Sequence, residues 1–223
     1  MNEKLIKTLK NGAEELGVDL SEGAVALFDS YLSELKVWNR KINLTAIDTD
    51  GEIVTKHFLD SLTPHRYLKG ATKLLDIGSG GGFPGLPLKI ADPALEVALI
   101  DCVEKKVHFM RHIIRKLGLK GASALAGRVE DPMIMDKHRG YFDAVISRAF
   151  TELKGFLSLA APYVAPGGMA IAMKGPQYEE ELHGVEGFKG FSPPEVHEVK
   201  VPFTDRTTAV IIFRKEAGQD VPR

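Results

Sequence analysis

The chain contains a single cysteine, Cys102, among its 223 residues. One cysteine excludes a disulfide within the chain and a zinc site built from several cysteines, and it is typical of a reducing compartment. No apolar run approaches the about 18 residues that a membrane-spanning helix requires. The N-terminal segment MNEKLIKTLKNGAEELG also lacks the continuous apolar stretch of a secretory signal. We therefore expect a cytoplasmic protein with no membrane partner.

Neither sign of charge is in large excess. The sequence has 29 Lys and Arg residues and 30 Asp and Glu residues, so its net charge is −1. A nucleic-acid partner is neither indicated nor excluded, because it requires a local basic surface rather than a basic total. The sequence has no internal repeat, no low-complexity tract and no spacing of His, Asp and Glu typical of a metal site. We expect no metal, and the sequence leaves the oligomeric state open, with a monomer expected.

The first 65 residues are expected to be a helical extension. Ser21 is a good N-cap, and apolar residues follow it at the three- and four-residue steps of one helix face. These residues are Val25, Phe28, Leu32, Leu35 and Trp38. A second helix is predicted over 53–62. Residues 66–216 then form the main domain, and 217–223 are expected to be a flexible tail.

From residue 73 onward, strand-like and helix-like segments alternate. The predicted strands of this part are 73–77, 96–101, 122–127, 142–148 and 169–174. Alternation of this kind favours a parallel sheet with helices on both faces. Two further strands, 197–203 and 207–214, are so close in sequence that they must pair antiparallel. The result is an α/β, Rossmann-like fold with a mostly parallel seven-stranded sheet and a C-terminal antiparallel hairpin. This plan resembles class I methyltransferases that use S-adenosylmethionine (AdoMet).

A glycine-rich turn, LLDIGSGGGFPG at 74–85, lies between a predicted strand and a predicted helix. In this layout, backbone N–H groups at a helix start receive a ligand. Gly80, Gly82 and Gly85 satisfy the dinucleotide pattern G-x-G-x-x-G. However, the turn begins at Gly78, and counting from there places Phe83 where a pyrophosphate needs the third glycine. AdoMet has no pyrophosphate, so it tolerates Phe83, which could pack against the ligand.

Asp101 ends the second predicted strand, where a carboxylate accepts hydrogen bonds from ribose hydroxyls. AdoMet and NAD both carry a ribose, so Asp101 supports a nucleoside cofactor without choosing between them. Alternatively, Asp101 caps the helix that begins at Val103. Asp76 either orients the glycine turn, meets the ligand's ammonium group, or bonds local backbone.

Six segments carry a resemblance to a known family. They are WNRKINLTAI (38–47), KHFLDSL (56–62), LLDIGSGGGFPGLPL (74–88), LIDCVEKKVHFM (99–110), GRVED (127–131) and VISRAF (145–150). With them, residues 30–215 resemble the glucose-inhibited division protein B family, bacterial methyltransferases that modify N7 of a guanosine in 16S ribosomal RNA of the small subunit. The turn SGGGFPG differs from the TGPGLPG of many relatives but keeps the small-residue spacing.

The resemblance implies AdoMet as cofactor and 16S ribosomal RNA or the small subunit as partner. It implies cofactor contacts at Gly78, Phe83, Val129, Glu130 and Arg148, with Asp101 as the ribose ligand and Gly80 in the same turn. Arg148 follows the fourth strand, so its guanidinium could hold the cofactor's carboxylate or an RNA phosphate, or form a structural salt bridge.

The chemistry implied by this resemblance requires no catalytic acid or base. Guanine N7 has a lone pair and no proton, so alignment with the methyl group is sufficient. Exocyclic amines are usually methylated beside an Asp/Asn-Pro-Pro-aromatic motif, but residues 147–150 read SRAF. Methylation of cytosine C5 needs a cysteine nucleophile, whereas Cys102 lies beside the ribose carboxylate.

Three residues are candidate RNA contacts. Lys105 and Arg111 belong to a basic face of the helix 103–117, and Lys174 ends the fifth strand at the ligand edge. The basic face could equally be an ordinary solvated surface. Trp38 is expected in the core rather than stacked on a base, and the roles of His57 and Asp60 stay open.

Three other functions are compatible with part of this sequence pattern. A small-molecule methyltransferase would have the same fold and cofactor, and a NAD-dependent oxidoreductase would bind NAD instead. A non-enzymatic RNA-binding module would bind RNA without any effect of a cofactor. The sequence does not say whether naked RNA or an assembled subunit is the substrate.

Overall fold

The computed structural model of the protein describes residues 1–217; the predicted tail, apart from residue 217, lies outside the described residues. Its helices are α1 (Glu3–Glu15), α2 (Glu22–Ile42), α3 (Asp50–Glu52), the π-helix η1 (Ile53–Leu59), α4 (Asp60–Leu62), the 3₁₀-helix η2 (His65–Leu68), α5 (Gly85–Ala91), α6 (Glu104–Lys116), α7 (Pro132–His138), α8 (Leu153–Ala160), α9 (Glu179–Leu182) and the 3₁₀-helix η3 (His183–Val185). The strands are β1 (Lys73–Ile77), β2 (Glu96–Asp101), β3 (Ala122–Ala126), β4 (Phe142–Arg148), β5 (Val164–Lys174), β6 (Glu195–Lys200) and β7 (Thr207–Arg214).

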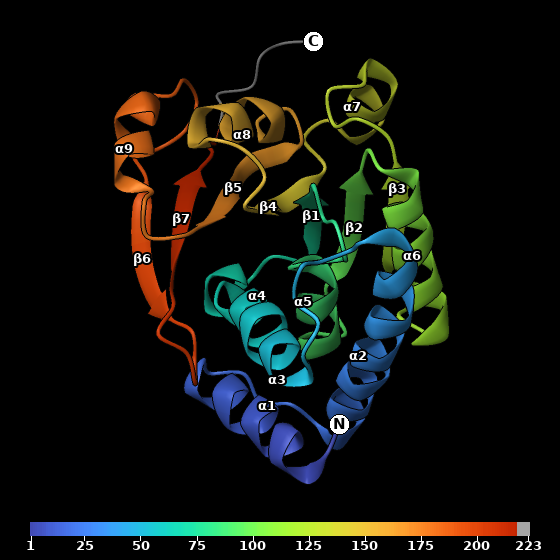
Figure 1. Ribbon diagram of the computed structural model, residues 1–223. Coiled ribbons are helices and arrows are strands. Elements are labelled where there is room, and N and C mark those ends of the chain that lie inside the picture. Colours follow the sequence, from blue (N-terminus) through green and yellow to red (C-terminus); the bar gives the residue numbers. More distant parts are fainter. Residues whose placement is uncertain (218–223) are drawn as a thin grey trace.

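The seven strands form one sheet in the order β3-β2-β1-β4-β5-β7-β6. The first five strands are parallel, whereas β7 pairs antiparallel with both β5 and β6. The predicted parallel sheet with a C-terminal antiparallel hairpin is therefore confirmed. The hairpin's second strand, β7, lies between β5 and the edge strand β6 (Figure 1).

Three strands have limits that differ from the prediction. β3 ends at Ala126 rather than at 127. β5 begins at Val164 rather than at 169, because Val164 continues the ladder opposite Phe142 of β4. β6 begins at Glu195 rather than at 197 and ends at Lys200 rather than at 203. The next residues form a turn, in which the Val201 N–H donates to the carbonyl oxygen of Arg206 over 2.9 Å. Turn hydrogen bonds thus remove the end of the apolar run 197–203 from the ladder.

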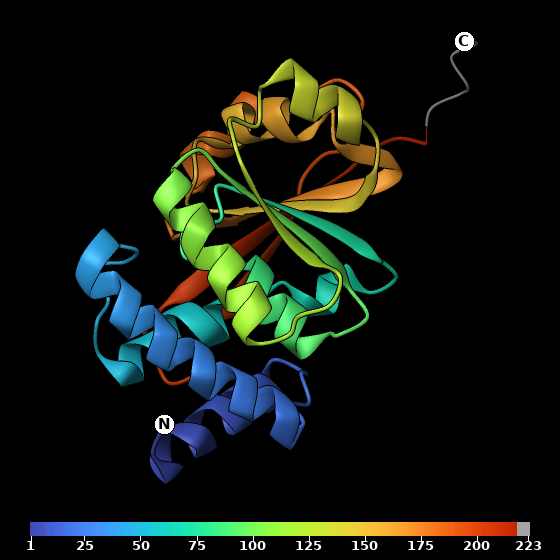
Figure 2. The ribbon, with the colours of Figure 1, turned by 90° about the vertical axis from the view of Figure 1, so that its right-hand side faces the viewer.

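Helices cover both faces of the sheet (Figure 2). Alternate strand residues enter two separate cores, as the two-residue period of a strand requires. On β1, for example, Leu74 faces the core that contains α5 and α6, and Leu75 faces the core of α8. The parallel strands are buried on both sides, which explains why they read as continuous apolar runs rather than as alternating ones.

The N-terminal helices share a core with the sheet. Leu9 of α1, Phe28 of α2 and Phe58 of η1 are completely buried in the same apolar cluster as Leu99 of β2. Ser21 caps α2 as predicted, by accepting a hydrogen bond from the Ala24 N–H at 3.1 Å. The helix predicted over 53–62 is present, but its first part is the π-helix η1. The extension therefore packs as one body with the sheet. A boundary at residue 65 stays a prediction.

No helix among the described residues is long and apolar enough to cross a membrane.

Candidate active site

The glycine turn crosses the carboxyl ends of β1 and β2. The Gly78 N–H donates to the carbonyl oxygen of Ile100 at 2.9 Å, and the Gly80 N–H donates to Oδ2 of Asp101 at 2.9 Å. Gly78, Gly80 and Gly82 have φ values of 71°, 58° and 93°, which other residues rarely adopt. The glycines are thus required by the backbone path, and the two bonds fix the turn against β2.

Asp76 fixes the start of α5 by a hydrogen bond to the backbone. Its Oδ2 accepts a hydrogen bond from the Gly85 N–H at 2.8 Å, and a Cβ on Gly85 would come within 2.9 Å of that oxygen and of Leu99. Its Oδ1 is buried and has no partner among the described residues. Burial raises the pKa of this carboxyl to about 7. Of the open alternatives for Asp76, the structure therefore supports bonding to local backbone that orients the turn.

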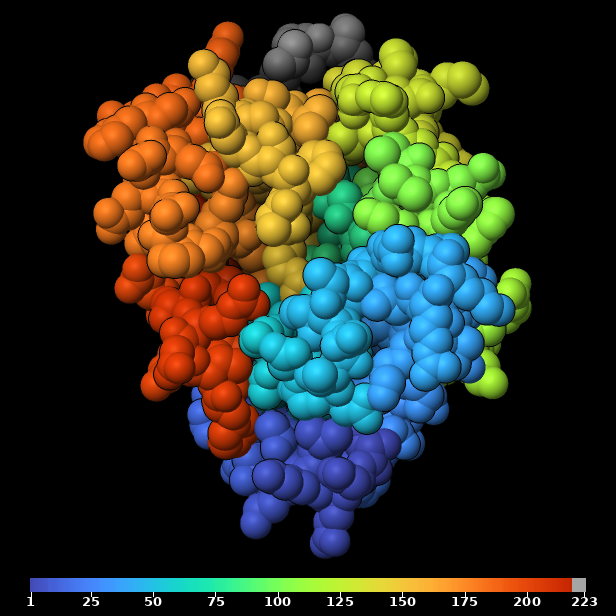
Figure 3. Space-filling model, viewed as in Figure 1, coloured from blue at the N-terminus to red at the C-terminus, as the bar shows by residue number. Residues whose placement is uncertain are grey.

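Asp101 lies at the floor of a cleft of about 380 Å³, called here the Asp101 cleft. Its Oδ1 accepts from the Val103 N–H at 2.8 Å, and its Oδ2 accepts from Gly80. A carboxylate has about four lone-pair sites, so these two bonds leave acceptor capacity for a ligand. In Figure 3 the teal segment of the turn is recessed between the yellow segment after β4 and the green segment around α6.

Arg148, the last residue of β4, is held by the helical segment 53–62. Its Nη1 donates to Oδ2 of Asp60 at 2.9 Å and to the carbonyl oxygen of Lys56 at 3.3 Å. Its Nη2 lies 3.1 Å from Nδ1 of His57. Thr208 of β7 donates to the other oxygen of Asp60 at 2.5 Å. The salt bridge considered for Arg148 is therefore present, and it joins three distant parts of the chain.

His57 is buried and neutral. Burial, followed by the neighbouring charge of Arg148, lowers its pKa from 6.5 to about 3. Because Arg148 donates to Nδ1, the proton of the neutral ring is on Nε2, which lies 2.7 Å from Oγ1 of Thr45. His57 thus accepts a hydrogen bond from Arg148 through Nδ1 and donates one to Thr45 through Nε2. These two bonds orient the guanidinium of Arg148.

Phe83 is buried on the side of the N-terminal helices. Its ring stacks on His57 with 4.5 Å between centroids and on Tyr31 with 5.5 Å, and the guanidinium of Arg148 lies over it at 5.1 Å. Phe83 is absent from the residues that line the Asp101 cleft. The structure thus assigns Phe83 to the support of Arg148, and its predicted contact with a cofactor stays a prediction.

A second cleft of about 640 Å³ opens beside the first, and it is called here the Arg148 cleft. Its walls include His57, Asp60, Arg148 and Lys174. Ala149 lines both clefts and has a φ of 50°. The two clefts therefore meet at the carboxyl end of β4, where ligands of open α/β sheets bind.

Comparison with known proteins decides the family. Residues 24–206 match the GidB family, described as rRNA small subunit methyltransferase G. The chain belongs to this family. A ribosomal RNA small subunit methyltransferase G from Geobacter sulfurreducens is 43% identical over 217 residues, which cover 95% of this chain and 99% of that protein. One of the same name from Pelotomaculum thermopropionicum is 39% identical, over 98% of this chain and 95% of that protein.

Solved structures confirm the fold class. An O-methyltransferase from Bacillus cereus in complex with SAH has a TM-score of 0.59 at 17% identity, over 83% of this chain and 91% of that one. A SAM-dependent methyltransferase from Aquifex aeolicus has a TM-score of 0.54 at 20% identity, over 77% and 96%. Family and fold together identify this protein as an AdoMet-dependent methyltransferase. An NAD-dependent oxidoreductase is excluded, and β7 also departs from the classic dinucleotide strand order.

The Asp101 cleft fits AdoMet. Asp101 offers free acceptor sites to ribose hydroxyls, and Val129, which is buried beside the exposed Glu130, offers an apolar surface at the cleft wall. A Cβ on Gly78 would lie 2.3 Å from the ring of Phe150, so the backbone must be bare at this point. Gly78, Asp101, Val129 and Glu130, all predicted as cofactor contacts, line this one cleft. Gly80 reaches it through its bond to Asp101.

The predicted RNA contacts have different surroundings. Lys105 is exposed on α6, and Arg111 is exposed but donates its Nε–H to the carbonyl oxygen of Ala124 at 3.0 Å. Lys174 bonds to Glu181 at 2.8 Å and to the carbonyl oxygen of Thr151 at 2.6 Å. Trp38 packs partly buried against Phe109, as expected. Lys105 is thus the freest of the three predicted contacts.

Sequence reasoning missed several residues of the site. The Tyr31 hydroxyl donates to the carbonyl oxygen of Gly81 at 2.5 Å and so ties α2 to the glycine turn. Tyr31 lies three residues after Phe28 on the apolar face of α2, which was a usable signal. Thr208 and Arg206 also line the Arg148 cleft, but no local pattern marked them.

Proposed function

We propose that the protein transfers the methyl group of AdoMet to N7 of a guanosine in 16S ribosomal RNA of the small ribosomal subunit. The observation that carries this proposal is the meeting of the Asp101 cleft and the Arg148 cleft at Ala149. A cofactor in the first and a base in the second would face each other across the end of β4. The family, whose description names small-subunit rRNA, supplies the class of substrate.

The residues around Ala149 favour a ring nitrogen without a proton as the acceptor. When bound, AdoMet supplies an electrophilic methyl group. As the bond from N7 to carbon forms, the bond from carbon to sulfur breaks, and the positive charge of the sulfonium passes to the purine. No proton moves in this step, so no general base is needed. The loop SRAF carries no carboxylate or amide for an exocyclic amine, and Cys102 lines the Asp101 cleft instead of the Arg148 cleft.

The protein's contribution is then alignment. Asp101 is fixed by two backbone N–H groups before any ligand arrives, so it would orient the ribose without reorganisation. Arg148 is fixed by Asp60 and His57 and lines the Arg148 cleft but not the Asp101 cleft. This placement favours an RNA phosphate or the guanine over the cofactor's carboxylate as its ligand. Lys174 ends β5 in the same cleft and would add positive charge there.

The decisive experiment is methyl transfer from labelled AdoMet to small subunits that lack the modification, followed by chain cleavage at 7-methylguanosine. We expect label in the RNA and cleavage at a single site, with both lost in Asp101→Ala. Label without cleavage would contradict N7 as the acceptor. No transfer to subunits or to their stripped RNA, despite AdoMet binding, would contradict the RNA substrate and favour a small molecule.

Subunit assembly takes place in the cytoplasm, and we propose that the protein acts there, as a monomer.

A further inference from the structure

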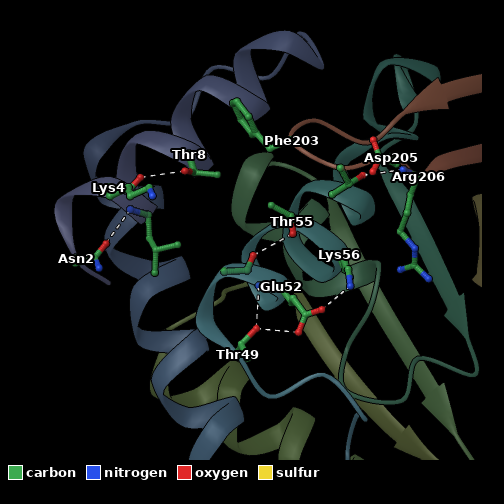
Figure 4. A pocket seen from close by; sticks show the side chains of 13 residues that line it. Asn2, Lys4, Thr8, Thr49, Glu52, Thr55, Lys56, Phe203, Asp205 and Arg206 are labelled. Atoms are coloured by element: carbon green, nitrogen blue, oxygen red, sulfur yellow. Dashed lines mark hydrogen bonds and ion pairs between the residues drawn. The ribbon is translucent and has the colours of Figure 1, made fainter.

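A third cleft of about 730 Å³ lies at the seam between α1, the helical segment 50–56 and the turn between β6 and β7 (Figure 4). We call it the seam cleft. It shares Lys56, Asp205 and Arg206 with the Arg148 cleft, which in turn shares Ala149 with the Asp101 cleft. The three clefts are therefore neighbours, and they follow one another from the glycine turn to the N-terminal helices.

Arg206 stands at the junction of the seam cleft and the Arg148 cleft. The other cations of the Arg148 cleft each face a carboxylate: Arg148 bonds to Asp60, Lys56 to Glu52 and Lys174 to Glu181. Within residues 1–217, the guanidinium of Arg206 is exposed and has no hydrogen-bond or ion-pair partner. Figure 4 shows it extending away from the turn. A fixed backbone with an unpaired guanidinium is suited to bind a phosphate.

Phe203 lines the seam cleft from the same turn. Its side chain is 56% exposed, and its φ of 61° lies in the left-handed region that a bulky residue avoids. The turn holds this conformation through bonds from the Thr204 N–H and hydroxyl to the carbonyl oxygen of Val201, at 3.2 and 2.9 Å. Strained backbone of this kind is concentrated at binding sites. Here it places an aromatic ring in the wall of the seam cleft, with one ring edge next to Gly12 of α1.

Apart from Leu5 and Gly51, the remaining residues that line the seam cleft have polar side chains. They include Lys4, with its ammonium group, and Thr8, Thr49 and Thr55, whose hydroxyls each donate to a nearby carbonyl or carboxylate oxygen and keep acceptor sites. Lys56 and Glu52 neutralise each other across 2.5 Å, so Lys4 and Arg206 face a single further carboxylate, Asp205. An exposed ring, hydroxyls and a net positive charge together match a nucleotide, which offers a base to stack, a sugar and a phosphate.

We propose that the seam cleft binds a nucleotide of ribosomal RNA that flanks the target guanosine. Arg206 binds the phosphate between the two nucleotides, and the flanking base stacks on Phe203. This inference rests on the proposed function, since it assumes that the target base occupies the Arg148 cleft. The strand would then run along the three neighbouring clefts.

The test compares binding of the full-length protein to unmodified small subunits over a range of salt concentrations, with S-adenosylhomocysteine present. Arg206→Gln should lower the slope of log K against log salt by about one, because one phosphate contact is lost. Phe203→Leu should weaken binding about tenfold with the slope unchanged, because stacking releases no counterions. The matched controls are Arg139→Gln and Tyr141→Leu, exposed residues near the amino end of β4, and they should behave as wild type.

A second measurement identifies what lies against the ring. With Phe203→p-benzoylphenylalanine, irradiation on subunits should give a crosslink to RNA that ribonuclease removes. A crosslink to a ribosomal protein, or none, would overturn the proposal. So would binding curves of Arg206→Gln and Phe203→Leu that match the controls, provided that their affinity for S-adenosylhomocysteine is unchanged. Absence of methyl transfer by the wild type on the same subunits would instead contradict the proposed function itself.

Discussion

The Asp101 cleft and the Arg148 cleft meet at one residue but are held together differently. In the first, the key carboxylate accepts from backbone N–H groups of Gly80 and Val103, within 21 residues along the chain. In the second, Arg148 and Asp60 are 88 residues apart, and Thr208 is 148 residues from Asp60. The carboxylate of the Asp101 cleft is thus held by backbone groups of consecutive elements, whereas the guanidinium of the Arg148 cleft is held by side chains from distant parts of the chain.

The charges of the two clefts differ as well. Lys106 and Arg128 balance Asp101 and Glu130 in the Asp101 cleft, whereas four cations and two carboxylates line the Arg148 cleft. Arg206 is the cation of that lining that has no ion-pair partner within residues 1–217. A balanced cleft suits AdoMet, which carries charges of both signs. A cationic cleft suits a phosphate backbone. The difference supports the proposed placement of the cofactor in the Asp101 cleft and of RNA in the Arg148 cleft, and the following predictions test that placement.

The largest expected effect is on cofactor binding. Asp101→Ala should weaken AdoMet binding by about 3 kcal/mol, or roughly 150-fold, because two ribose hydroxyls lose their acceptor. Asp101→Asn keeps one acceptor oxygen and should lose about tenfold. Cys102→Ser, an exposed neighbour in the same cleft, is the control. Calorimetry measures all three, and unchanged affinity in Asp101→Ala would refute the ribose role.

The second prediction concerns the pair between Arg148 and Asp60, whose side chains are 17% and 15% exposed. A double-mutant cycle with Arg148→Ala and Asp60→Ala should give a coupling of about 2 kcal/mol in the free energy of unfolding. The pair between Arg214 and Glu195 is 51% and 41% exposed and should give less than about 1 kcal/mol. Urea unfolding measures both cycles. Equal coupling energies in the two cycles would mean that burial does not strengthen the pair between Arg148 and Asp60.

The third prediction uses the pKa of His57. The ordinary value of 6.5 applies to the unfolded chain, and burial lowers the folded value to about 3. Between these values the unfolded chain binds a proton that the folded protein does not, so stability falls as pH falls below 6.5. From pH 7 to pH 5, the wild type should lose about 2 kcal/mol more than His57→Gln.

Asp76 acts in the opposite direction in this experiment. Its pKa is raised to about 7, so its contribution to stability is present at low pH and is lost as pH rises toward 7. Because both proteins contain Asp76, its effect cancels in the difference between them. Parallel pH curves for wild type and His57→Gln would show that His57 is not buried as a neutral ring.

The smallest effect is expected on α6. Lys105→Gln should change the salt dependence of RNA binding by less than Arg206→Gln does, because Lys105 lies on a helix face outside the three clefts. The same slope measurement decides this. A larger effect at Lys105 would move the RNA path from the seam cleft to α6.

Much of this architecture could be predicted, because it depends on short-range patterns. The bounds of β1, β2, β4 and β7 coincide with the predicted strands, since each is an apolar run ended by a charged residue or a turn. The glycine turn and Asp101 were recognisable because consecutive elements of a parallel sheet bring their carboxyl ends together. The limits of β5 and β6 were missed, because their pairing partners rather than their own residues determine them.

The sequence by itself thus determined the fold class, the position of the glycine turn and, through family motifs, the class of reaction, which is methylation of small-subunit ribosomal RNA. Only the tertiary structure decided the partners of Arg148, the burial of Phe83 next to its guanidinium, and the position of Phe203 and Arg206 in the lining of one cleft. The physical reason is the sequence separation between the residues that interact. Backbone conformation and strand periodicity are set by near neighbours, whereas an ion pair across 88 residues exists only after helices and sheet have packed.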